Sequence, residues 1–184
     1  MIRVIKLGGS LLEASVLPAC LDAAERLEGR IVIVPGGGVF AEQVRVAQGL
    51  WRFDDVAAHR MAILAMQQMA LLFNSLRPDF ALFDTAAELG GLPRIVIWSP
   101  QVDELDHAGV DVGWDVTSDS LAAWLAGQVR ADELLLVKSA AVGAGATLAE
   151  LQAQGIVDAA FNRHAERLSC PITVINKDHF LSGA

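Results

Sequence analysis

Several features that identify common protein classes are scarce in this sequence of 184 residues. It contains no tyrosine, only three lysines and only two cysteines, Cys20 and Cys170, which lie far apart and outside any CxxC pair. Cysteines in this arrangement give no support to a zinc or redox site, so we expect reduced thiols in the core. We predict no metal-binding residues from the sequence.

Positive charge is scarce as well. The 14 lysines and arginines are outnumbered by 22 aspartates and glutamates, the formal net charge is −8, and no basic cluster appears. A nucleic acid would be repelled by such a surface, so nucleic-acid binding is excluded. A small anionic ligand would need a local region of positive potential, which makes the position of each lysine informative.

Long hydrophobic runs are also lacking. Hydrophobic residues make up 53% of the chain, but charged residues interrupt every apolar stretch before the roughly 18 residues that a membrane span requires. The chain enters a strand-like run within two residues, without the basic start and apolar core of a signal peptide. We therefore expect a cytoplasmic protein with no membrane segment.

Short apolar runs alternate with amphipathic stretches along the whole chain. The runs are apolar throughout, as in strands covered on both faces, and lie at Ile2–Leu7, Ile31–Val34, Ile95–Trp98, Leu134–Val137 and Ile172–Ile175. Helical patterns lie at about Leu11–Leu27, Val39–Leu50, Val56–Leu76, Ser118–Gln128, Leu148–Gln154 and Val157–Leu168. This alternation predicts one α/β domain, a three-layer αβα sandwich with a mostly parallel central sheet.

Two of the predicted strands run directly into glycines. Residues 6–10 read Lys-Leu-Gly-Gly-Ser, and residues 35–38 read Pro-Gly-Gly-Gly. Glycines let backbone N–H groups approach a phosphate, and a helix that begins just afterwards adds the positive end of its dipole. A strand-to-helix connection often needs a glycine for geometry alone, so one such turn is weak evidence, but two favour a site for oxyanions.

Two of the three lysines end predicted strands. Lys6 lies at the end of the first strand, and Lys138 follows Leu134–Val137, whereas surface lysines usually lie on exposed helix faces. Open parallel sheets bind ligands beyond the carboxyl ends of their strands. Both lysines and both glycine turns are therefore expected at one edge of the sheet.

A cluster of hydroxyl and carboxylate groups precedes and begins the helix expected at Ser118. These residues could simply cap the helix, with Asp115, Thr117 or Ser118 accepting free N–H groups and Asp119 complementing the dipole. Alternatively, Asp119 faces inward between the two lysines, which would fix both side chains and lower its own pKa. The preceding segment, Asp103–Trp114, is rich in Asp and Gly and predicts a loop that covers or borders the site.

Together, these motifs resemble the amino acid kinase superfamily of phosphotransferases. Four segments carry the resemblance in order along the chain: residues 6–10, 35–38, 117–122 and 135–139. Residues 114–120, 134–139 and 155–158 are most similar to a compact subgroup that includes an (aminomethyl)furan-methyl phosphate kinase of methanofuran biosynthesis. The resemblance implies an acceptor-binding part at about 1–113 and a reduced nucleotide-binding part at about 114–184.

The resemblance also implies ATP as phosphoryl donor, Mg²⁺ bridging the nucleotide phosphates, and a small anionic acceptor. The expected catalytic residues are Lys6, Asp119 and Lys138. Residues expected to bind nucleotide or phosphate are Gly8, Gly9, Ser10, Ser118, Ser139, Gly143 and Gly145. The residues expected to bind substrate are Gly36, Gly37, Gly38, His59, Trp114, Asp115 and Thr117. His59 is included because an imidazole can bind an acceptor phosphate, and not because of the resemblance.

Alternatives remain open at this point. A non-catalytic nucleotide or oxyanion-binding protein on the same scaffold is compatible with the short region after Lys138, where Gly143 and Gly145 form either a reduced nucleotide loop or a plain turn. A Rossmann-type enzyme ranks last, because no GxGxxG follows the first strand. A kinase ranks first. No evident base lies beside the glycine turns, which favours an ionised phosphate monoester or carboxylate as acceptor, with Asp115 or His59 as the alternative, a base for an alcohol acceptor.

The helix expected at Val56–Leu76 is unusually apolar. An exposed apolar stripe of that length would otherwise promote aggregation, so we expect a homodimer that covers it.

Overall fold

A single parallel sheet forms the centre of the protein. The computed structural model describes residues 1–13, 15–143 and 145–183, leaving out the side chains of residues 12 and 13. The sheet order is β3-β4-β2-β1-β5-β6, and every described pair is parallel. The strands are β1 (Ile2–Leu7), β2 (Arg30–Pro35), β3 (Ala81–Phe83), β4 (Ile95–Trp98), β5 (Glu133–Lys138) and β6 (Ile172–Asn176).

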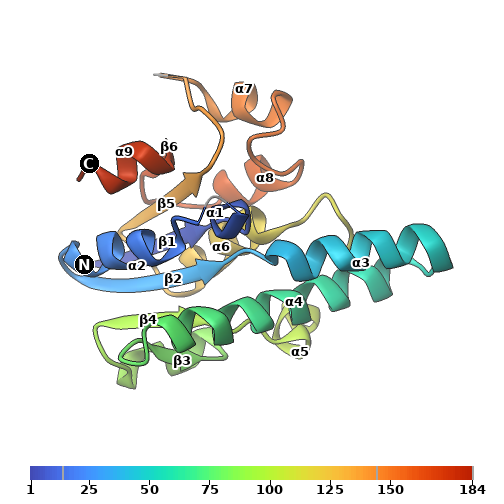
Figure 1. The fold of residues 1–184 in the computed structure, drawn as a ribbon, viewed down its shortest axis with the longest axis horizontal. Helices are drawn as coiled ribbons and strands as arrows, with labels where there is room; N and C mark the ends of the chain where they lie inside the picture. Colours follow the sequence, from blue (N-terminus) through green and yellow to red (C-terminus); the bar gives the residue numbers. More distant parts are fainter. Residues whose placement is uncertain (14, 144, 184) are drawn as a thin grey trace.

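Helices cover both faces of this sheet (Figure 1). In chain order they are α1 (Ser10–Glu13), α2 (Leu17–Arg26), α3 (Gly38–Trp51), α4 (Asp55–Leu76), the 3₁₀ helix η1 (Ala86–Gly91), α5 (Val102–His107), α6 (Ser118–Gln128), α7 (Leu148–Ala153), α8 (Phe161–Ala165) and α9 (Lys177–Leu181). The predicted three-layer αβα sandwich is therefore confirmed.

Two apolar clusters form the core, one on each face, because successive residues of a strand point to opposite sides. Val4 and Leu136 pack on the face covered by α6 and α8. Ile5 and Leu135 pack on the face covered by α2 and α9. The strands are apolar on both sides, as the uninterrupted runs predicted.

The helices α3 and α4 lie side by side and project beyond the sheet as a helical arm (Figure 1). Only Val44 of α3 is buried, whereas the second half of α4 packs against the sheet through Met69, Ala70 and Phe73. By length and composition alone, α4 is long and apolar enough to cross a membrane. However, 44% of its apolar stretch is buried inside the protein. Core helices of soluble domains are often as long and as apolar as this. The contacts of α4 with β2, β3 and β4 are those of a core helix that packs on a sheet.

Several predicted elements differ in extent from the structure. The helix expected at Leu11–Leu27 is two helices, α1 and α2; Ala14 between them lies outside the described residues, and Ser15 has a left-handed backbone with φ of 54°. Pro18 near the start of α2 has no N–H to donate to a preceding turn, so one continuous helix cannot form there. The helix expected at Val157–Leu168 is limited to α8, Phe161–Ala165.

Four short elements were not predicted: β3, η1, α5 and α9. The first part of the loop expected at Asp103–Trp114 is helical, because α5 runs from Val102 to His107. The remainder, residues 108–117, connects α5 to α6 and borders the cavity described below.

Candidate functional site

The two strand-ending lysines point to the same face of the sheet. Lys6 is two residues beyond Val4, and Lys138 is two residues beyond Leu136, so both side chains emerge on the face that α6 covers. Because β1 and β5 are neighbours, the lysines end up close together around one carboxylate. The Lys6 Nζ lies 2.9 Å from Asp119 Oδ1, and the Lys138 Nζ donates to Asp119 Oδ2 at 2.5 Å.

This charged triad is buried. Lys6 and Asp119 are 6% and 4% exposed. Burial opposes the charged form of Asp119, but Lys6 and Lys138 hold the pKa of its carboxyl group below the ordinary value. Burial, and then the neighbouring charge of Lys6, lower the pKa of Lys138 to about 8, against the opposing effect of Asp119. Two ammonium groups around one carboxylate leave net positive charge at the carboxyl edge of an acidic protein.

The position of Asp119 is fixed by the first turn of α6. Thr117, which precedes the helix, forms no capping bond with its own side chain. Instead Asp158, from the segment between α7 and α8, accepts from the Thr117 N–H (3.0 Å), the Thr117 hydroxyl (2.8 Å), the Ser120 N–H (3.0 Å) and the Ser120 hydroxyl. The helix is therefore capped from outside, and Asp119 is left to face the lysines.

The two glycine turns lie against each other at this edge. The Gly36 N–H donates to the Leu7 carbonyl at 2.9 Å. A Cβ on Gly36 would lie 2.8 Å from the Gly9 nitrogen, and a Cβ on Gly9 would collide with the backbone of Gly38. Gly38 also has a φ of +54°. Close backbone packing thus accounts for three of these glycines without a ligand, and it also brings both turns to one place.

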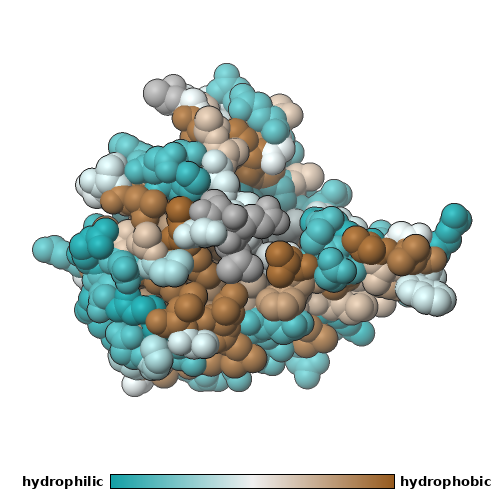
Figure 2. Space-filling model, viewed as in Figure 1, coloured by the Kyte–Doolittle hydropathy of each residue, from teal (hydrophilic) through white to brown (hydrophobic). Residues whose placement is uncertain are grey.

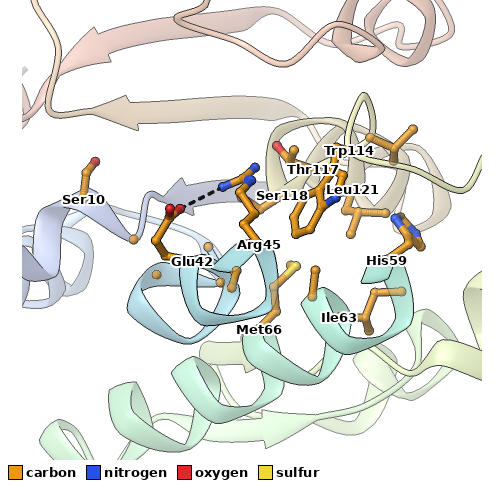
Figure 3. A pocket seen from close by; sticks show the side chains of 17 residues that line it. Ser10, Glu42, Arg45, His59, Ile63, Met66, Trp114, Thr117, Ser118 and Leu121 are labelled. Atoms are coloured by element: carbon orange, nitrogen blue, oxygen red, sulfur yellow. Dashed lines mark hydrogen bonds and ion pairs between the residues drawn. The ribbon is translucent and has the colours of Figure 1, made fainter. Parts of the chain in front are cut away.

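A cavity of about 350 Å³ opens beside these turns (Figure 3). Its lining comes from the glycine turns, the facing sides of α3 and α4, and the segment from Trp114 into α6. Ser10 lies at one end and His59 at the other, with Arg45 and Thr117 between them (Figure 3). Ile63, Met66, Val116 and Leu121 make part of the wall apolar, so the cavity suits a small ligand with one charged end.

A second, more open cavity of about 690 Å³ adjoins the first. Arg45, Trp114 and Thr117 line both cavities, which therefore meet at these residues. Asp119 and Lys138 line the second cavity together with residues of α7 and the segment that follows it, including Gln152, Gly155, Ile156, Val157, Asp158 and Asn162. Two members of the charged triad thus border the second cavity, and Thr117, two residues before Asp119, borders both.

Most of the predicted site residues come together here. Those that line the first cavity are Gly9, Ser10, Gly36, Gly37, Gly38, His59, Trp114, Thr117 and Ser118. Gly8 is adjacent to Lys6, since a Cβ on it would lie 3.3 Å from the Lys6 Nζ. The Ser139 hydroxyl shares a hydrogen bond of 2.8 Å with the Ser10 hydroxyl, which links the turn after β5 to the turn after β1.

Three predicted residues do not join this group. Asp115 is exposed and belongs to the described lining of neither cavity. Gly143 and Gly145 are exposed as well, on either side of Ala144, which lies outside the described residues. The Ala146 N–H donates to the Gly143 carbonyl, and Gly145 has a φ of +74°, so these glycines form a turn beyond β5.

His59 is buried within the first cavity wall, with Nδ1 3.2 Å from the Gly113 carbonyl. Burial lowers its pKa, while the Gly113 carbonyl and Asp106 act in the opposite direction. With its pKa lowered below the ordinary value, the ring is mostly neutral near pH 7 and supplies little positive charge to the cavity.

Sequence reasoning missed two groups of residues at the site. Asp158 ends the segment 155–158, which carries part of the family resemblance, but nothing in the sequence linked Asp158 to the start of α6. Glu42 and Arg45 lie one turn apart on α3, a spacing that any surface helix can show. Among the described residues, no group of three or more His, Cys, Asp or Glu side chains is arranged to hold a metal ion.

Comparison with known proteins gives relatives in sequence and in fold. The chain is 27% identical over 139 residues to the [5-(aminomethyl)furan-3-yl]methyl phosphate kinase of Methanocaldococcus jannaschii, covering 73% of this chain and 64% of that relative. In fold it is similar to the uridylate kinase of Archaeoglobus fulgidus (TM-score 0.76, 18% identity, 98% of this chain and 94% of that one). The UMP kinase of Ureaplasma parvum is also similar (TM-score 0.71, 17% identity, 97% and 90%).

A family profile described as "Amino acid kinase family" matches residues 1–142. That range includes both glycine turns, Lys6, Asp119 and Lys138, so the match and the charged triad coincide, and the chain belongs to the amino acid kinase family.

Proposed function

We propose that this protein is an ATP-dependent kinase that transfers the γ-phosphoryl group of ATP to a small ionised acceptor, a phosphate monoester or a carboxylate. One observation carries the proposal: Asp119 holds Lys6 and Lys138 together at the edge of the second cavity, and Thr117, two residues before Asp119, lines both cavities. Anion binding alone does not require a carboxylate between two lysines. Phosphoryl transfer does benefit from cations held in fixed positions.

The reaction needs little covalent chemistry from the protein. An acceptor oxygen attacks the γ-phosphorus, the bond to the bridging oxygen of ADP breaks, and ADP leaves with the electron pair. Lys6 and Lys138 would neutralise charge on the transferring group, and backbone N–H groups of Gly8 and Gly9 would donate to its oxygens. An ionised acceptor has no proton to lose, so no catalytic base is required.

We assign ATP to the second cavity, within the reduced nucleotide-binding part at about 114–184. Lys138 lines this cavity and fits a polyphosphate, and Ile156 and Val157 offer apolar surface for a base. The paired hydroxyls of Ser10 and Ser139, at the turns after β1 and β5, would reach the transferring phosphoryl group. Mg²⁺ usually binds through substrate phosphates with few protein ligands, so it would arrive on ATP and neutralise phosphate charge. Residues 114–121 contribute to the acceptor cavity too, so the two parts share this segment.

The first cavity, mainly within the acceptor-binding part at about 1–113, is our site for the acceptor. The reacting end would lie beside Gly9 and Ser10, and the far end beside His59. The curated relative is named for an (aminomethyl)furan-methyl phosphate, a planar ring with a phosphate at one end. We propose an acceptor of this kind, for a step of methanofuran biosynthesis, because Trp114 and Met66 could contact such a ring.

The other candidate function is binding of a nucleotide or oxyanion without turnover. The family match ends at residue 142, before most of the proposed nucleotide-binding part, and the alignment spans only 64% of the curated relative. Catalysis remains the better proposal because the complete triad is present. A binding protein would retain ATP without consuming it.

We also propose a homodimer located in the cytoplasm. Exposed apolar side chains of α3 and α4 lie along the projecting arm, including Val46, Leu50, Trp51, Leu64 and Leu71 (Figure 2). A second copy of the chain would cover them. Cys20 and Cys170 are free thiols, which fits a reducing compartment.

Incubation of the purified protein with ATP, Mg²⁺ and a panel of phosphate monoesters, carboxylates and carbamate tests the proposal. Mass spectrometry should detect one acceptor that gains the mass of a phosphoryl group while ADP accumulates. ATP binding without any phosphorylated product across the panel would favour the binding protein.

A further inference from the structure

Arg45 differs from other arginines of this protein in how little its guanidinium group is used. Arg94 donates to three backbone carbonyls, and Arg30 donates to two. Within the described part of the chain, Arg45 donates one hydrogen bond, to Glu42 at 3.3 Å, and the two side chains are 48% and 62% exposed. An exposed pair of this kind contributes little to stability. Among the described contacts, most of the five donors of Arg45 are thus available.

Arg45 is also held in a defined position at the cavity. Its guanidinium carbon lies 4.2 Å from the centre of the Trp114 ring, which engages the flat face and leaves the N–H edges open. The Trp114 indole N–H donates to the Gln48 side chain at 2.7 Å. Gln48 in turn donates to Asp55 and to the Phe53 carbonyl. The ring that supports Arg45 is therefore fixed to the turn between α3 and α4.

An anionic acceptor in the first cavity requires a cation that Asp119 does not already engage. Lys6 and Lys138 are both engaged by Asp119, and Arg45 is the one lysine or arginine among the described residues that line the first cavity. It also lines the second cavity, so it lies where donor and acceptor would meet. An ionised acceptor that approaches the phosphates of ATP needs a positive group on its own side.

We propose that Arg45 is the specificity-determining residue that binds the ionised oxyanion of the acceptor, with Glu42 as its counter-ion until the acceptor arrives. The inference rests on the proposed function. Because a guanidinium binds carboxylates as well as phosphates, the choice of a phosphate monoester of a small, partly apolar group follows the name of the curated relative. A guanidinium edge binds a phosphate through two parallel hydrogen bonds, which an ammonium cannot reproduce. Glu42 competes for the same donors, so removing its charge strengthens acceptor binding.

Binding of phenyl phosphate without ATP tests this assignment through calorimetry and tryptophan fluorescence. Arg45→Met should weaken binding by about tenfold or more, and Arg45→Lys by less. Glu42→Gln should strengthen it by a few fold. Arg60→Met is the matched control, because Arg60 lies on α4, pairs with Asp106 and lines neither cavity. With an active acceptor, Arg45→Met should raise KM for the acceptor by a larger factor than KM for ATP, because Arg45 lines both cavities.

Equal binding of phenyl phosphate by Arg45→Met and the unmodified protein would overturn the assignment, as would weaker binding by Glu42→Gln. So would a failure of the unmodified protein to bind phenyl phosphate at millimolar concentration. Arg45-dependent binding without turnover of any acceptor would instead refute the proposed kinase while supporting the role of Arg45. Equal turnover of an acceptor by Arg45→Met and the unmodified protein would support the proposed kinase and refute the role of Arg45.

Discussion

Asp119 is the residue on which the arrangement of the site depends most directly. Its carboxylate lies between two ammonium groups, so Asp119→Asn leaves Lys6 and Lys138 without the negative charge that joins them and free to move apart. Loss of a fixed electrostatic group at a reacting centre costs about 100-fold or more in turnover. We expect a decrease of that size for Asp119→Asn and for Lys6→Ala in a coupled assay of ATP consumption.

A surface pair provides the control for that experiment. Asp178 pairs with Lys177 and has a side chain 75% exposed, so Asp178→Asn removes an equal charge outside the cavities. Circular dichroism should show that all variants are folded. Full turnover by a folded Asp119→Asn variant would contradict the proposed role.

Lys138 predicts a pH dependence of nucleotide binding. Its pKa is lowered to about 8, mainly by burial and next by the charge of Lys6. The protonated form binds phosphate, so affinity for ADP should fall as pH rises through this value. For a lysine with this pKa, the loss between about pH 7 and pH 9 is about tenfold. Calorimetry with Mg²⁺-free ADP measures it, and Lys138→Arg, which keeps its charge, should give a much flatter profile.

The residues of the charged triad could be predicted because each has a local signal. Lysines at the ends of apolar strands and an aspartate at the start of a helix are unusual positions, and parallel topology brings strand ends together. Arg45 and Glu42 carry no such signal. Their role depends on the distance between α3 and the segment after Gly113, which is set by tertiary packing.

At the scale of elements, the capping of α6 by Asp158 connects the C-terminal part of the chain to the site. One carboxylate accepts from two backbone N–H groups and two hydroxyls of the first turn. Asp158→Ala leaves these donors without that acceptor and should lower the free energy of unfolding by about 2 kcal/mol. It should also reduce turnover, because Asp119 lies in the same turn. Urea titration and the ATP assay measure the two effects.

The capping box of α7 provides a comparison for Asp158. The Thr147 side chain accepts from the Glu150 N–H, and Glu150 accepts from Thr147. Thr147→Ala should cost about 1 kcal/mol with no change in turnover, because neither residue lines the cavities. Equal losses of activity in both variants would show that Asp158 acts only through general stability.

Long, strongly patterned elements could be predicted from the sequence, and short ones could not. The strands β1, β2, β4, β5 and β6 and the long helix α4 are close to the predicted ranges. β3 has three residues, too few to show a period, and it forms through pairing with β4. The break between α1 and α2 follows from Pro18, a local signal that the apolar pattern of Leu11–Leu27 concealed.

At the scale of the whole molecule, the arm of α3 and α4 links the site to the proposed dimer. Arg45 and His59 belong to this arm, and both line the acceptor cavity. The arm projects from the sheet (Figure 1), and several of its apolar side chains are exposed, so little of the protein's own core stabilises its free end. A partner that covers the arm would therefore also hold the acceptor cavity in shape.

The dimer is expected to separate when charge is introduced on α4. Leu64 and Leu71 lie two turns apart on one face and are 47% and 61% exposed, so Leu64→Glu with Leu71→Glu places two carboxylates in the proposed interface. Light scattering should give about twice 19.6 kDa for the unmodified chain and the monomer mass for this variant. The same substitution at Val112, an exposed apolar residue outside the arm, should leave the mass unchanged.

Acceptor binding should weaken in the monomeric variant, because Arg45 and His59 would then lie on an unsupported arm, while ADP binding at the second cavity should change less. Calorimetry with phenyl phosphate and with ADP separates the two effects. If the unmodified protein is a monomer and binds phenyl phosphate tightly, the arm does not need a second copy of the chain to hold Arg45 and His59 in place. The exposed apolar residues of α4 would then not form a dimer interface.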